Sequence, residues 1–116
     1  MISIDAADPT PPFEQIRQQM ADQIRTGVIV AGTKLPSVRQ LAGDLRVANG
    51  TVVRAYSELE AEGLLESNRS GTRVRRVDVL PAEARTAARA YIASLHGLSL
   101  DDAISAVRAE WARTAG

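Results

Sequence analysis

The 116-residue chain contains no cysteine, a single histidine and no excess of charge of either sign. Without cysteine, disulfides and cysteine-ligated zinc are excluded, and this composition is typical of a reducing compartment. No segment approaches the roughly 20 apolar residues that a membrane-spanning helix needs. The first ten residues, MISIDAADPT, lack the basic and then apolar pattern of a signal peptide. We therefore expect a cytoplasmic protein without a membrane partner.

Aromatic residues are also scarce: the chain has one tryptophan, two tyrosines and one phenylalanine. Candidate catalytic residues are also few. An enzyme needs convergent acids, bases or a nucleophile. His96 stands beside Gly97, as an ordinary residue at a helix C-terminus would, and no partner for it is evident. We expect neither an enzyme nor a protein that holds a metal ion or a cofactor.

The charges balance, with 14 basic and 14 acidic residues, so any binding of a polyanion must come from local asymmetry. That asymmetry exists. Residues 69–76 read RSGTRVRR, with four arginines and no acid, whereas residues 58–63 read ELEAEG. Taken alone, the arginine cluster is explained equally well as a solvated strand edge.

Hydrophobic periodicity predicts a mainly helical chain with one small β-hairpin. The first helix is expected to start at Pro11, with Thr10 as its cap, and to end at Gly27. Ser37 and Gln40 form a capping-box pattern at the start of a second, short helix. The apolar stripes of these helices are Phe13, Ile16, Met20 and Ile24, then Val38, Leu41 and Leu45.

A break at residues 47–50 separates the second helix from a third, which is expected to end at Gly63. Its apolar stripe is Val52, Ala55, Tyr56 and Leu59, and we expect Tyr56 to lie in the core. The segments LLES and TRVRRV then alternate like two strands around the turn NRSG.

Helix, helix, turn, helix and hairpin is the order of a winged helix-turn-helix. Helices this short are marginal alone. Their value lies in holding the third helix so that its N-terminal end can enter a DNA major groove. Small and polar residues in VANGTV, residues 47–52, allow close approach, and helix N-terminal N–H groups favour phosphate. The alternative is a winged helix that binds protein, which would expose apolar residues on the third helix.

Residues 11–74 also resemble the DNA-binding domain of the GntR family of bacterial transcription regulators. The most specific pieces are LPSVRQLA, TVVRAYSELEAEGLL and the closing GTRV. The resemblance implies a homodimeric regulator, expected to be a repressor, that binds a palindromic double-stranded DNA operator. It does not indicate the operator sequence or whether a small-molecule effector exists.

The resemblance also implies which residues contact DNA: Ser37, Arg39, Asn49, Gly50, Thr51, Arg54, Arg69, Ser70, Gly71, Thr72, Arg73 and Arg75. Arg39 matches an arginine that contacts DNA in this family; the alternative is a surface residue that pairs with Asp44. Thr51 has the alternative role of a cap for the third helix. Two departures limit the transfer. Many members carry arginine or proline-asparagine where this chain has Ala48 and Asn49, and the wing turn NRSGT is one residue short and lacks a first glycine.

The hydrophobic pattern of residues 77–116 predicts two short amphipathic helices. Pro81 opens the first, and Ser99, with Asp102 three residues later, caps the second. They are too small to enclose an effector pocket, and they resemble the short dimerisation tail of the YtrA-like branch. We therefore divide the chain into a winged helix-turn-helix (1–76) and a dimerisation tail (77–116). The expected interface residues are Tyr91, Ile92, Leu95, Leu100, Ile104, Val107 and Trp111. The alternative is that both helices pack back on their own chain.

Overall fold

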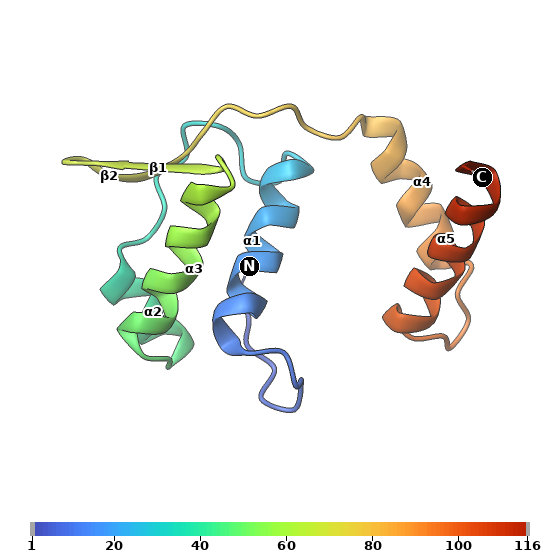
Figure 1. Cartoon of the computed structure of the whole chain (residues 1–116), viewed down its shortest axis with the longest axis horizontal. Coiled ribbons are helices and arrows are strands. Elements are labelled where there is room, and N and C mark those ends of the chain that lie inside the picture. Colours follow the sequence, from blue (N-terminus) through green and yellow to red (C-terminus); the bar gives the residue numbers. More distant parts are fainter. Residues whose placement is uncertain (1, 116) are drawn as a thin grey trace. The chain divides into compact units, whose positions relative to one another are not determined.

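A computed structural model describes residues 2–115 and shows five helices and one antiparallel hairpin in this part of the chain (Figure 1). The elements are α1 (Pro12–Arg25), α2 (Val38–Leu45), α3 (Asn49–Ala61), β1 (Leu65–Asn68), β2 (Gly71–Val74), α4 (Ala82–Ala93) and α5 (Leu100–Ala115). The expected fold class, mainly helical with a small hairpin in a winged helix-turn-helix, is confirmed. No helix within residues 2–115 combines the length and the apolar character needed to span a membrane.

The chain forms two compact units, one up to Leu80 and one from Pro81 onward. The division falls after Leu80 rather than after Arg76 because the intervening residues belong to the first unit. Val77 packs against the core of that unit, and the Leu80 N–H donates to the Arg25 carbonyl at 2.8 Å.

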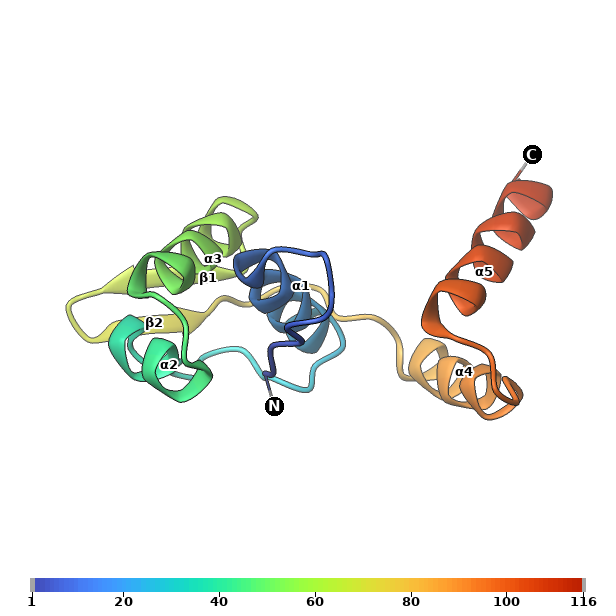
Figure 2. The same ribbon diagram turned by 90° about the horizontal axis from the view of Figure 1, so that it is seen from below.

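The core of the first unit forms between α1 and α3, which lie side by side (Figures 1 and 2). α1 begins one residue later than the sequence predicted, with Pro11 as its N-cap and Pro12 as its first residue. The predicted stripe of α3 is buried throughout, Tyr56 included. Other buried core residues come from α1, α2, the connection and the hairpin: Ile16, Met20, Ile24, Ile29, Leu35, Leu41, Leu65 and Val74.

The helix-turn-helix is shaped by local hydrogen bonds at each end of α2. The Ser37 hydroxyl accepts from the Gln40 N–H at 3.1 Å, as the capping pattern predicted. At the other end Arg46 adopts a left-handed backbone (φ 57°), and the Val47 N–H donates to the Ala42 carbonyl at 3.0 Å. α3 then starts at Asn49, so Thr51 lies inside the first turn and is not its cap.

Tyr56 fixes the start of α2 against α3. Its ring is buried in the core, and its hydroxyl donates to the Pro36 carbonyl at 2.8 Å. Burial raises the pKa of the Tyr56 phenol to about 12, so the donor stays protonated at neutral pH. The contact joins residues 20 positions apart in the sequence, and Pro36 directly precedes Ser37, the N-cap of α2.

Replacing Tyr56 with phenylalanine should lower the free energy of unfolding by about 1 kcal/mol, because the partly buried Pro36 carbonyl loses its donor. Urea denaturation measures this change. Tyr91→Phe is the matched control, since the Tyr91 hydroxyl makes a longer bond of 3.2 Å in the second unit. Equal small losses in both variants would mean that the Tyr56 hydroxyl does not hold α2.

Candidate DNA-binding surface

The N-terminal turns of α2 and α3 and the hairpin, called the wing here, carry the residues expected to contact DNA. All three elements belong to the first unit, and α2 packs directly on α3. On α3 the residues opposite the buried stripe are exposed, and Gly50, Val53 and Ser57 follow one another at helical spacing along this outer face. The outer face of α3 is therefore open from its first turn.

Arg39 is the second residue of α2, and it is exposed. The ion pairs formed within residues 2–115 involve other arginines, so the alternative pairing of Arg39 with Asp44 is not present. The guanidinium is available to a ligand that approaches the start of α2.

Gly50 has no structural role that its surroundings explain. A Cβ atom built there would meet nothing within 4 Å, and Gly50 is not among the glycines with positive φ. Glycine within a helix is less favourable than alanine by up to about 1 kcal/mol. A glycine that the fold does not require, at the exposed start of α3, is a site where another molecule can approach the backbone closely.

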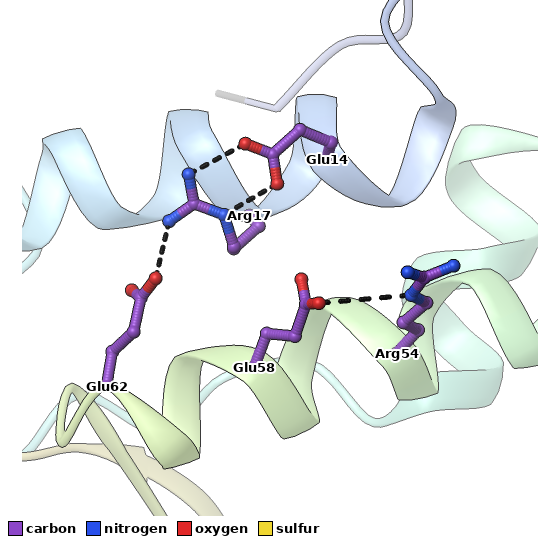
Figure 3. A network of polar contacts seen from close by, with 5 residues as sticks. All are labelled: Glu14, Arg17, Arg54, Glu58 and Glu62. Atoms are coloured by element: carbon purple, nitrogen blue, oxygen red, sulfur yellow. Dashed lines mark hydrogen bonds and ion pairs between the residues drawn. The ribbon is translucent and has the colours of Figure 1, made fainter.

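Arg54 is exposed but contacts two side chains of its own unit. Its guanidinium lies over the Phe13 ring, 3.6 Å from the ring centroid, and 3.9 Å from the Glu58 carboxylate. Figure 3 shows Arg54 and Glu58 on α3 beside a second group of charges from α1 and the end of α3. The contact with Phe13 directs Arg54 toward α1 and leaves the outer stripe of α3 with little positive charge.

The second group of charges joins α1 to the end of α3. Arg17 makes two hydrogen bonds to Glu14, at 2.7 and 2.8 Å, and one to Glu62 at 2.8 Å (Figure 3). The hydrogen bonds between Arg17 and Glu14 are the main cause of two pKa shifts. They raise the pKa of Arg17 and lower the pKa of Glu14. Part of the acidic run in residues 58–63 is thus used in holding the helices together.

The wing is a short antiparallel hairpin with a two-residue tip. Leu65 lies opposite Val74 and Asn68 opposite Gly71, and the Asn68 side chain accepts from the Ser70 N–H at 2.7 Å. Arg69 and Ser70 form the exposed tip. The hairpin is anchored on its inner side by Ser67, whose hydroxyl lies 2.9 Å from that of Thr72 and donates to Glu60 of α3 at 2.6 Å.

The extended segment before α2, residues 32–35, pairs with β2 along the edge of the wing. The Leu35 N–H donates to the Thr72 carbonyl and the Gly32 N–H to the Val74 carbonyl, both at 2.8 Å. Lys34 and Arg73 pair through their backbones in an isolated antiparallel β-bridge. A Cβ atom built at Gly71 would lie 2.9 Å from the Lys34 Cε. Gly71 is favoured by its backbone, whose φ of 118° side-chain-bearing residues rarely adopt, and the flexible end of Lys34 lies over it.

Sequence reasoning missed Lys34 as part of the wing, because its only signal was one basic residue in an extended connection. The wing arginines also differ from one another. Arg73 is half-buried and donates to the Gly32 carbonyl at 3.1 Å, whereas Arg69 and Arg75 are exposed. Residues 69–73 and Lys34 are brought together at the wing; Arg75 lies one residue beyond β2, and its N–H donates to the Leu64 carbonyl.

The second unit carries an apolar groove of about 440 Å³ between α4 and α5. Six of the seven expected interface residues line it, namely Tyr91, Ile92, Leu100, Ile104, Val107 and Trp111. Leu95, which follows the end of α4 at Ala93, instead lines a separate cavity with Leu98 and Leu100. Ser99 and Asp102 form the predicted reciprocal cap of α5, each bond 3.1 Å long.

The tail helices bury little of their own apolar surface. Of the tail residues up to 115, only Ala103 is buried, and Leu100 and Trp111 are 75% and 74% exposed. Residues 2–115 contain no cluster of three or more histidine, aspartate or glutamate side chains arranged to hold a metal ion.

This combination of an open recognition helix, a basic wing and a rigid helix pair is that of a winged helix-turn-helix transcriptional regulator. The sequence profile of the bacterial regulatory proteins of the gntR family matches residues 12–74. The chain therefore belongs to the GntR family, as the resemblance indicated, and is a DNA-binding transcriptional regulator.

Two curated relatives resemble the chain clearly within and beyond this region. The HTH-type transcriptional regulator Rv1152 of Mycobacterium tuberculosis is 42% identical over 85% of this chain and 83% of its own length. The HTH-type transcriptional repressor YtrA of Bacillus subtilis is 48% identical over 60% of this chain, and the match spans about half of that relative, 53%.

Solved structures agree. YtrA from Sulfolobus acidocaldarius, a GntR-family transcription factor, has a TM-score of 0.62 at 34% identity over 80% of this chain and 98% of its own. The DNA-binding domain of AraR, solved with operator ORR3, has a TM-score of 0.53 at 26% identity over 61% of this chain and 87% of its own. The YtrA-like branch is thus confirmed as the relevant part of the family.

Arg39→Ala should abolish or strongly weaken operator binding while the chain stays folded. The side chain is exposed and unpaired within the described residues, so its loss costs the fold little. Removing a base-reading arginine costs about 1–3 kcal/mol for each of its contacts. A titration of labelled operator measures this, with urea denaturation as the check on folding; wild-type affinity in the variant would remove Arg39 from the site.

Proposed function

We propose that this chain acts in the bacterial cytoplasm as a homodimeric repressor, with one winged helix-turn-helix on each half of a palindromic operator. The observation that carries the proposal is the open first turn of α3, where a Cβ atom built at Gly50 would meet nothing within 4 Å beyond its own helical turn. The duplex is the natural occupant of that space, because a major groove admits an α-helix.

The contacts expected on DNA divide into two kinds. Arg39, Asn49 and Gly50 lie at helix starts and would face base edges and the nearest phosphates. Arg69 at the wing tip, with Lys34 beside Gly71, would face the backbone, where lysine and arginine supply affinity without sequence preference. Repression follows when the operator overlaps a promoter, and the name of the Bacillus subtilis relative, a repressor, supports this direction.

The groove of the tail supports the homodimer. A monomer that leaves Leu100, Val107 and Trp111 exposed carries an apolar surface of the kind that marks an interface. The small groove volume suits side chains of a second copy. With two related domains, half-sites would be separated by about one helical turn of DNA.

The alternative function is a winged helix that binds protein, and selection from a pool of random-sequence DNA duplexes distinguishes the two functions. Selection of duplexes from a random-sequence pool by the full chain, in excess non-specific competitor, should yield one palindromic sequence. A pool that shows no enrichment would overturn the proposal in favour of the protein-binding alternative.

Replacing Arg69 and Arg75 together with glutamine should weaken binding to selected and random duplexes alike, because phosphate contacts carry no sequence information. The slope of log affinity against log salt should fall by about one unit for each phosphate that the variant no longer neutralises. Arg89→Gln, which removes one positive charge from an exposed site on α4, is the control, and the slope should stay unchanged in it. An unchanged slope would make the arginine cluster a solvated strand edge.

Trp111→Glu in the full chain should shift the dimer toward monomer, since a carboxylate at the centre of an apolar interface would lack a partner. Sedimentation measures the shift, and operator affinity should fall with it. Val28→Glu places the same charge on an exposed valine of the first unit and should leave the dimer intact. A fully dimeric Trp111→Glu protein with unchanged operator affinity would assign the tail another purpose.

A further inference from the structure

Val53 is the one large apolar side chain that α3 exposes within the described chain. It is 48% exposed, while every other apolar residue larger than alanine on that helix is buried. It lies three residues after Gly50 and four before Ser57, so these three residues form a single stripe along the outer face. No role for Val53 was evident from the sequence, because the expected contacts were polar or small.

The fold does not explain a valine at this position. Val53 is absent from the buried core and from the partly buried residues that pack against it. A β-branched residue is also a poor choice for an exposed helical position, where alanine or a long polar chain would be more favourable. Both Gly50 and Val53, one helical turn apart, are thus less favourable for folding than alanine, and both lie on the face that the proposed function directs toward DNA.

The major groove offers one apolar group that a valine can contact, the C5-methyl of thymine. Such a contact needs the helix backbone close to the base edges, and Gly50 leaves that space free, since a Cβ there would meet nothing within 4 Å. Arg54, the positive charge on α3, lies over Phe13 rather than over this stripe.

We infer that Val53 is a specificity-determining residue that reads thymine, its methyl groups packing against the thymine C5-methyl while Gly50 allows the approach. This inference rests on the proposed binding of an operator by α3. The protein-binding alternative fits the stripe less well, because a single valine between Gly50 and Ser57 is too small to anchor an interface.

The test uses the full chain and the duplex that it selects from a random pool. Each thymine of a half-site is replaced, together with its symmetric partner, by deoxyuridine, which lacks only the C5-methyl. Removal of one buried methyl group weakens binding by about fourfold. We expect one symmetric thymine pair at which the affinity of the wild-type protein falls by about fourfold per half-site.

Val53→Ala should bind the unmodified operator with the same reduction in affinity, and deoxyuridine at that pair should then weaken it no further. Val28→Ala, a second exposed valine of the same unit but outside α3, should keep the full deoxyuridine penalty. Urea denaturation should show Val53→Ala to be as stable as wild type, since alanine favours the helix.

Two results would overturn the inference while leaving the proposed function intact. One is a selected operator in which no thymine-to-deoxyuridine change weakens binding. The other is a deoxyuridine penalty of the same size in wild type and in Val53→Ala, which would assign the methyl to another residue. Failure to select any duplex is a separate result that overturns operator binding itself.

Discussion

The hydrogen bond from Tyr56 to the Pro36 carbonyl is the contact on which the geometry of the DNA-binding unit depends. It couples the start of α2, where Ser37 and Arg39 lie, to the middle of α3. Because the donor is a buried phenol, the bond is short, directional and independent of pH in the neutral range. The two helix starts expected to contact DNA are thereby held in one fixed relation.

Other constraints extend this rigidity outward. Arg17, oriented by Glu14 of its own helix, ties α1 to the end of α3 through Glu62. The segment 32–35 pairs with β2, and the wing and the helix-turn-helix belong to the same compact unit. These ion pairs lie partly exposed and contribute modestly to stability. Their larger effect is positional, since a recognition surface must keep its elements aligned before the duplex arrives.

Most of the winged helix was predictable because its signals are local. The stripe of α3, the Ser37 cap and the hairpin each follow from spacings within a few residues, and all occur in the structure. The start of α1 was misplaced by one residue, since Thr10, Pro11 and Pro12 offer overlapping cap patterns. Long-range contacts were not predictable. The pairing of Lys34 with the wing and the position of Arg54 over Phe13 depend on how distant segments pack.

Because its charges balance, one unit alone is expected to bind DNA weakly. Within the first unit, Arg17 and Arg54 are engaged with acidic or aromatic side chains, and Arg73 donates to a backbone carbonyl. The exposed cations that remain at the helix starts and the wing are few, so the sequence-independent attraction to phosphate stays small. In the proposed dimer, the tail would make the binding of two such units to adjacent half-sites effectively intramolecular, and the second contact would then multiply the affinity of the first. Low charge in each unit and the proposed dimer would therefore be complementary: non-specific binding would stay low, and a paired site would be favoured over a single one.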